Sequence, residues 1–228
     1  MKKIVVLSGA GISAESGVKT FRDSGGLWEN HRIEDVATFE AWQRNTELVN
    51  NFYNQRRKQL FEVNPNPAHF ALAKLEDKYN VQVITQNVDD LHERGGSSNI
   101  LHLHGELKKV RSTGDDSLIY NLDGWELKLG DTCEKGYQLR PHIVWFGEEV
   151  PNIPIAAEIC ASADILIIIG TSLNVYPAAG LIHYVPANCK KYLIDPNTQL
   201  NPSANGIEII NKNASEGVTG LVDVLLKE

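Results

Sequence analysis

The sequence predicts an α/β fold, a Rossmann-like doubly wound parallel sheet that carries a small inserted lobe. Short runs of β-branched and aliphatic residues alternate with segments of helical periodicity along most of the chain. One run, Asp164 to Ile169, is the most apolar in the protein, as expected for a central parallel strand. The alternation is interrupted between Lys108 and Arg140, where the pattern favours a small β structure.

Composition narrows the class of protein. A chain of 228 residues with 42% hydrophobic residues can bury one sizeable core. The net charge of −7 argues against broad binding to nucleic acid or to anionic membranes, and no apolar stretch approaches the length of a membrane span. Three scattered cysteines suit a reducing compartment, so the predicted location is the cytoplasm.

The first predicted strand, Ile4 to Leu7, is followed by a glycine-rich turn and a predicted helix. Gly9, Gly11 and Ala14 fit the spacing G-x-G-x-x-A, in which small residues let the backbone approach a pyrophosphate. The free amides and positive dipole of the helix would then face the phosphates. Because glycine turns also follow strands for packing reasons, this pattern alone leaves both interpretations open.

The next segments predict a loop and two helices. Residues 18–28 contain a Gly-Gly pair and predict a long loop beside the phosphate site. Apolar residues recur at helical intervals from Phe39 to Phe61, and Asn-Pro-Asn-Pro at 64–67 ends that helix before a second one, Ala68 to Tyr79.

Polar residues follow the second predicted strand, Val81 to Thr85. Gln86, Asn87 and Asp89 come where open α/β sheets bind ligands, at the carboxyl end of a buried strand. A single polar residue there would be a helix cap, but three in four positions favour a binding site.

Two histidines and an interrupted region come next. His102 and His104 alternate with apolar residues, so both face the same way along an extended segment. A zinc site would need further ligands, and the next histidine is as distant as His142. Beyond them, residues 118–122 and 125–129 flank Asp-Gly, a hairpin signal.

The remaining elements restore the alternation. They are a strand at 143–146 with a turn at 147–148, a helix at 154–163, the strand Asp164 to Ile169 with the turn Gly170-Thr171-Ser172, strands at 191–195 and 207–210, and a helix at 218–226.

Several motifs occur in a fixed order along the chain. They are Gly9 to Val18 with Phe21-Arg22, Thr85 to His92, His104-Gly105, Val144 to Glu148, and Gly170 to Val175. Together they closely resemble the sirtuins, which are NAD-dependent protein-lysine deacylases. The resemblance runs from the first strand to the last helix. It implies one catalytic domain, 1–228, with a Rossmann-like part at about 1–30, 80–104 and 143–228. The small lobe would comprise 31–79, which is helical, and 105–142, a β hairpin without zinc.

The resemblance also implies roles for individual residues. NAD would be held by Gly9, Ala10, Gly11, Ala14, Phe21, Arg22, Gln86, Asn87, Asp89, Gly170, Thr171, Ser172, Asp195 and Ala214. The acylated-lysine peptide would bind along Val144, Trp145, Phe146, Gly147 and Glu148 as an added strand. The catalytic residues would be His104, Asn87 and Asp89. His104 would act as general base on a ribose hydroxyl, while Asn87 and Asp89 position the cofactor.

Tyr53 and Arg56 share one helix face. In isolation they are a surface arginine beside a half-buried tyrosine. They also match the Tyr-x-x-Arg of the sirtuins that prefer succinyl- and malonyl-lysine, where a guanidinium fork receives a carboxylate. The resemblance therefore implies removal of succinyl, malonyl and also acetyl groups, giving nicotinamide and O-acyl-ADP-ribose. An NAD hydrolase or ADP-ribosyltransferase using the same cleft is the alternative.

The chain departs from the family pattern in three places. Many sirtuins carry two Cys-x-x-Cys pairs in the small lobe, whereas Cys133 is the sole cysteine between Glu106 and Arg140. Asp195 stands where the family usually has asparagine, and Asp23 follows Arg22 in place of a small residue.

The cysteine count predicts that the purified protein contains no zinc, because one thiolate cannot build a tetrahedral structural site. Metal analysis of the native protein should find well under one zinc per chain. One equivalent that survives dialysis would contradict the prediction.

Overall fold

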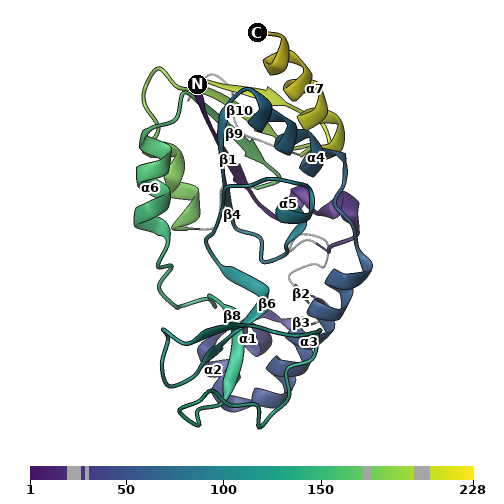
Figure 1. The fold of residues 1–228 in the computed structure, drawn as a ribbon, viewed down its shortest axis with the longest axis vertical. Helices are drawn as coiled ribbons and strands as arrows, with labels where there is room; N and C mark the ends of the chain where they lie inside the picture. The colour runs from purple at the N-terminus through teal and green to yellow at the C-terminus, as the bar shows by residue number, and fades with distance from the viewer. Residues whose placement is uncertain (20–26, 29–30, 172–175, 198–205) are drawn as a thin grey trace.

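The computed structural model describes residues 1–19, 27–28, 31–171, 176–197 and 206–228. Its main sheet has six parallel strands in the order β11-β10-β9-β1-β4-β5. Their bounds are β1 Lys3–Ser8, β4 Asn80–Thr85, β5 Ile100–His102, β9 Ile165–Ile169, β10 Lys190–Ile194 and β11 Ile207–Ile210. The predicted doubly wound sheet is confirmed, and it occupies one end of the molecule (Figure 1).

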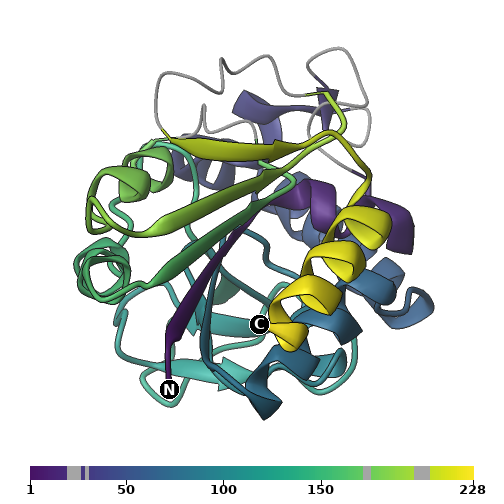
Figure 2. The ribbon, with the colours of Figure 1, turned by 90° about the horizontal axis from the view of Figure 1, so that it is seen from above.

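Helices cover both faces of this sheet. One face carries α4 (Pro67–Lys74), η3 (Leu75–Asp77) and α7 (Ala214–Lys227). The other carries α6 (Ile153–Ala161) and η4 (Ala178–His183). Seen from above, α7 (yellow) and α6 (green) lie on opposite sides of the strands (Figure 2).

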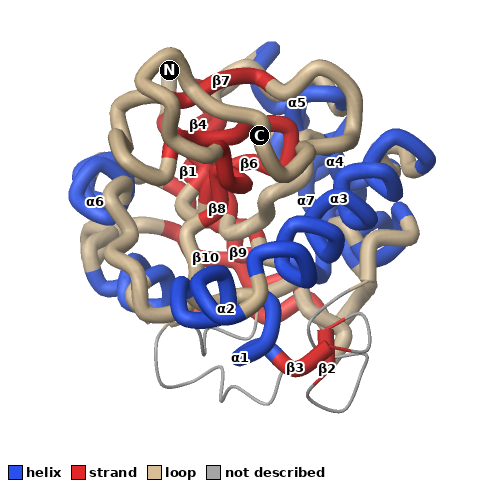
Figure 3. The backbone as a smooth tube through the Cα atoms, turned by 90° about the horizontal axis from the view of Figure 1, so that it is seen from below, coloured by secondary structure: helices blue, strands red, loops and turns tan. Residues whose placement is uncertain are grey.

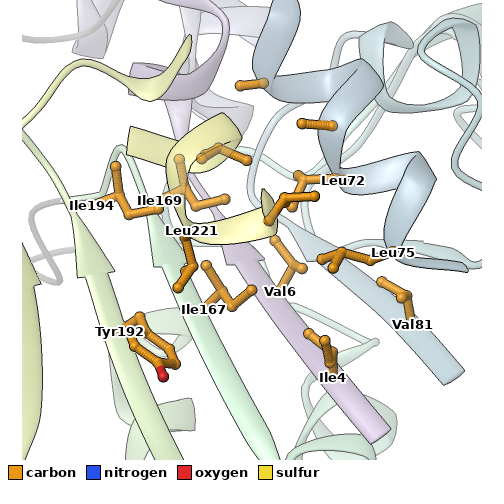
Figure 4. Close-up of a cluster of buried hydrophobic side chains, with 14 of the residues drawn as sticks. Ile4, Val6, Leu72, Leu75, Val81, Ile167, Ile169, Tyr192, Ile194 and Leu221 are labelled. Carbon is orange, nitrogen blue, oxygen red and sulfur yellow. The ribbon is translucent and has the colours of Figure 1, made fainter. Parts of the chain in front are cut away.

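The strands are apolar at nearly every position because both of their faces are buried. In β1, Ile4 and Val6 pack under α4 and α7 (Figure 4), whereas Val5 and Leu7 belong to the cluster under α6. The same alternation continues along β9. Side chains of successive strand residues point to opposite faces, so a strand between two helical layers needs hydrophobic residues throughout.

The chain crosses the sheet at its centre. From β1 it runs to β4 and β5 on one side, and it returns to β9, β10 and β11 on the other. The loops after β1 and β9 therefore leave the sheet side by side, at the topological switch point where such sheets bind ligands.

The helix predicted after the first glycine turn is not formed. The structure has two short 3₁₀ turns, η1 (Ala10–Ile12) and η2 (Ala14–Ser16). Gly17 then adopts a left-handed φ of 90°, which ends the helical path. A long helix dipole is thus absent here, and the turn has only its own backbone amides to offer a phosphate.

The small lobe lies at the other end of the molecule (Figure 1), and Figure 3 views the molecule from that end. Its helical part comprises α1 (Ile33–Val36), α2 (Phe39–Arg44) and α3 (Thr46–Glu62), with the strand pair β2 (Leu27–Trp28) and β3 (His31–Arg32) before them. Its sheet has the order β7-β6-β8, formed by Gly105–Ser112 (β6), Ile119–Asn121 (β7) and Leu139–Ile143 (β8). The helix predicted over 39–61 is divided at Asn45, whose side chain accepts a 3.0 Å hydrogen bond from Leu48 N and caps α3.

The predicted hairpin around Asp123-Gly124 is wrong. The strand β7 pairs with β6 across a turn at 113–118, and residues 125–129 form no strand. Within residues 125–129, Trp125 and Leu129 are 38% and 48% exposed, whereas Leu127 is buried.

Leu127 is held by polar side chains of α3. Asn54 both donates to the carbonyl of Leu127 and accepts from its amide, at 2.9 Å each, and Asn50 donates to the same carbonyl at 2.6 Å. The buried guanidinium of Arg57 donates to the carbonyls of Leu107 and Trp125 and to Asn54 Oδ1. Burial lowers the pKa of Arg57 to about 10. We term Asn50, Asn54 and Arg57 the α3 clamp, because they join α3 to the β part of the lobe.

Residues 67–79 do not belong to the small lobe. Ala68, Ala71, Leu72 and Leu75 pack on the main sheet together with α7. The predicted helical range of the lobe, 31–79, was therefore too long at its end, because the pattern of a helix does not reveal which sheet its apolar face covers. None of the described helices is long and apolar enough to cross a bilayer.

Arg57→Met should lower the free energy of unfolding by about 2–3 kcal/mol, because it removes the hydrogen bonds from a buried guanidinium to the carbonyls of Leu107 and Trp125. Gln55→Met on the exposed side of α3 is the matched control. Denaturant unfolding of both variants measures the difference, and equal stabilities would show that the α3 clamp contributes nothing.

Candidate active site

A cavity of about 670 Å³ lies between the carboxyl ends of β1, β4, β9 and β10 and the small lobe. Each predicted site residue that the structure describes lines it. These are Gly9, Ala10, Gly11, Ala14, Tyr53, Arg56, Gln86, Asn87, Asp89, His104, Val144, Trp145, Phe146, Gly147, Glu148, Gly170, Thr171, Asp195 and Ala214. Phe21, Arg22 and Ser172 lie outside the described residues.

The floor of the cavity is formed by two glycine turns in direct contact. Gly9 N donates to Ile169 O and Gly11 N to Gly170 O, both at 2.9 Å. A Cβ on Gly11 would lie 2.5 Å from Gly170 Cα, and Gly170 itself has a φ of +60°. Packing alone therefore requires glycine at these positions. The same lack of side chains lets a phosphate group approach the backbone closely here.

One serine orients the polar residues after β4. Ser13 Oγ donates to Asp89 Oδ2 at 3.0 Å and accepts from Asn87 Nδ2 at 3.1 Å. Burial raises the pKa of Asp89, an effect partly offset by bonds from Leu91 N and Ser13. Sequence reasoning missed Ser13, although it lies within the first glycine motif and is a buried hydroxyl directly between two binding-site turns.

His104 has a defined tautomer. Its Nδ1 lies 3.0 Å from Gln86 O, and a carbonyl can only accept, so Nδ1 carries the proton and Nε2 is the basic nitrogen. Burial lowers the pKa of His104, and the bond to Gln86 offsets this only in part. The ring lines the cavity in its neutral form at physiological pH.

His102 bonds to the neighbouring carbonyl of the same turn. Its Nδ1 lies 3.0 Å from Asn87 O, and its Nε2 lies 2.8 Å from Glu93 Oε1. Burial lowers its pKa, but the bond to Glu93 and the carboxylate charge outweigh burial and raise it overall. His102 thus joins the turn to α5 (Leu91–Arg94). The ligand atoms of Glu93, His102 and Glu106 all lie within 4.8 Å of one another, close enough to hold a metal ion.

In the predicted peptide-binding stretch, residues 144–148, most backbone amides donate hydrogen bonds within the protein. Val144 N, Trp145 N, Phe146 N and Glu148 N donate to acceptors within the protein. Of this stretch, only the Gly147 amide has no acceptor among the described residues. An added strand would therefore bond mainly to carbonyls here.

Tyr53 and Arg56, both on α3, line the cavity. The Tyr53 side chain is buried and its hydroxyl accepts a 2.9 Å bond from Trp145 Nε1. Burial raises the pKa of Tyr53 far above its usual value, so the phenol keeps its proton. The pair thus offers a cation and a neutral hydroxyl at one end of the cavity.

Comparison with known proteins gives the class of the protein. Residues 9–177 match the model of the Sir2 family, and the chain belongs to this family. An NAD-dependent protein deacylase of Bacteroides thetaiotaomicron is 56% identical and aligns over 99% of both chains. One of Helicobacter pylori strain J99 with the same name is 55% identical, over 100% of this chain and 97% of the relative.

Solved structures agree with this assignment. A Sir2 homologue in complex with NAD superposes with a TM-score of 0.90 at 39% identity, over 99% of this chain and 90% of the other. A complex described as Sir2–p53 peptide–NAD⁺ superposes with a TM-score of 0.81 at 28% identity, over 99% and 94% of the two chains.

The pKa values of His102 and His104, which bond to the turn after β4, should shift in opposite directions from the ordinary imidazole value of 6.5. NMR titration of the ring nitrogens is expected to place the pKa of His104 below that value and the pKa of His102 above it. Glu93→Gln should lower the pKa of His102 and leave that of His104 in place. Equal values for both rings would contradict these environments.

Proposed function

We propose that this protein is an NAD-dependent protein-lysine deacylase that transfers the acyl group to ADP-ribose. The observation that carries the proposal is the single cavity lined by the glycine turns, His104 and the Tyr53–Arg56 pair. The names of the relatives, NAD-dependent protein deacylases, and the NAD and ADP-ribose complexes of the solved Sir2 homologues support it.

The residues have separate tasks in this reaction. NAD, when bound, supplies the electrophilic ribose carbon to which the acyl oxygen attaches. His104 Nε2 takes the proton from a ribose hydroxyl, since Nδ1 is occupied by Gln86 O. Asn87 and Asp89 orient the ribose and nicotinamide end, and Ser13 holds both of them in place.

We propose that Tyr53 and Arg56 direct the enzyme to succinyl- and malonyl-lysine, with acetyl-lysine a weaker substrate. A guanidinium binds a carboxylate through two charge-assisted hydrogen bonds, and a phenol adds a third. An acetyl group has no carboxylate to meet them. The partners are acylated proteins or peptides, which would lie along residues 144–148.

The reaction products test the proposed activity. Incubation with NAD and peptides that carry acetyl-, malonyl- or succinyl-lysine should give nicotinamide and O-acyl-ADP-ribose by mass spectrometry. His104→Ala should reduce deacylation at least about a hundredfold, in the range of a lost general base. Plain ADP-ribose without acyl transfer would indicate an NAD hydrolase instead. Full activity of the variant would exclude His104 as the base.

Arg56→Met should lower kcat/KM for desuccinylation by about a hundredfold, because it removes a paired charge from the acyl pocket. Deacetylation should fall much less. Arg44→Met, at an exposed ion pair with Asp35, is the matched control. Equal losses for the two acyl groups in Arg56→Met would contradict the proposed preference.

A further inference from the structure

We propose that Trp145 determines acyl specificity as a positioning residue. Its indole N–H occupies an acceptor site of the Tyr53 hydroxyl and so aims the hydroxyl proton into the acyl pocket, at the carboxylate of an acidic acyl group. This inference rests on the proposed preference for succinyl- and malonyl-lysine and gives a reason for it beyond the Tyr-x-x-Arg pair.

The direction of the hydrogen bond follows from the chemistry of the two groups. An indole nitrogen can only donate, so at a distance of 2.9 Å the Tyr53 oxygen must accept. The phenol has a single proton, which must then point elsewhere. Among the residues that the structure describes, Tyr53 Oη has no second partner, and Tyr53 lines the cavity beside Arg56.

Trp145 is itself held rigidly. The guanidinium carbon of Arg140 lies 3.7 Å from the centroid of the indole, and its two terminal nitrogens, Nη1 and Nη2, each donate to a carboxylate oxygen of Glu148 at 2.8 Å. Glu148 Oε2 also accepts from Trp145 N at 2.8 Å. The ring of Trp42 also packs against the indole, with 5.8 Å between the ring centroids. The indole N–H therefore keeps one direction, and a cation over the ring strengthens it as a donor.

A directed phenol proton discriminates between acyl groups. A succinyl or malonyl carboxylate accepts it, since burial keeps the phenol in its protonated form. A methyl group leaves the donor unpaired in a buried site, which penalises acetyl-lysine. If the indole bond were absent, the hydroxyl could rotate toward any acceptor, and part of this discrimination would be lost.

The experiment compares kcat/KM for succinyl- and acetyl-lysine peptides and follows their ratio. Trp145→Phe keeps an aromatic ring beside Arg140 and Trp42 but removes the N–H. It should lower the succinyl-to-acetyl ratio about five- to tenfold, mainly through KM of the succinyl peptide. Tyr53→Phe should lower the ratio at least as much. The double variant should show no further fall, because Trp145 acts through the Tyr53 hydroxyl.

Trp42→Phe is the matched control, since it disturbs the same aromatic stack without touching the hydroxyl, and its ratio should equal that of the wild type. If Trp145→Phe does not fold, a benzothiophene in place of the Trp145 indole keeps the bicyclic shape and removes the N–H.

The outcomes separate this inference from the proposed function. A wild-type protein that removes both acyl groups equally would contradict the proposed preference and, with it, the role of Trp145. If the wild type prefers succinyl-lysine, two results would overturn the role of Trp145 and leave the proposed function intact. One is an unchanged succinyl-to-acetyl ratio after loss of the indole N–H, and the other is additive effects in the double variant.

Discussion

The contact between the two glycine turns is the constraint on which the site depends. The turns after β1 and β9 touch through backbone atoms, with Gly11 N bonded to Gly170 O, and no side chain fits between them. This contact closes the switch point of the sheet and forms the floor of the cavity. The neighbouring strand β4 pairs with β1 up to Ser8 and Thr85. Asn87 and Asp89 therefore follow β4 directly beside the first glycine turn.

Helix α3 carries both residues that stabilise the small lobe and residues that line the cavity. The helix carries the α3 clamp, which holds the segment around Leu127, and it also carries Tyr53 and Arg56, which line the cavity. The α3 clamp supports the lobe through hydrogen bonds to backbone groups of its β part. The two residues proposed to bind the acyl group therefore lie on the helix that the α3 clamp joins to the β part of the lobe.

Burial sets the protonation states in the cavity. It holds His104 neutral and Tyr53 protonated, while the ion pair with Glu93 keeps His102 more basic than an ordinary histidine. A base and a hydrogen-bond donor can therefore coexist in one cavity at the same pH.

The sequence by itself determined the strands of the main sheet, the glycine turns and the polar ends of the strands, because these depend on local periodicity and on motifs of adjacent residues. It did not reveal that β7 pairs with β6, that 67–79 packs on the main sheet, or that Ser13 joins Asn87 to Asp89. The bond between Trp145 and Tyr53 spans 92 positions. Only the tertiary structure decided these features. Which segments pair or pack together depends on how well each arrangement buries apolar surface, and a local sequence pattern does not contain this information.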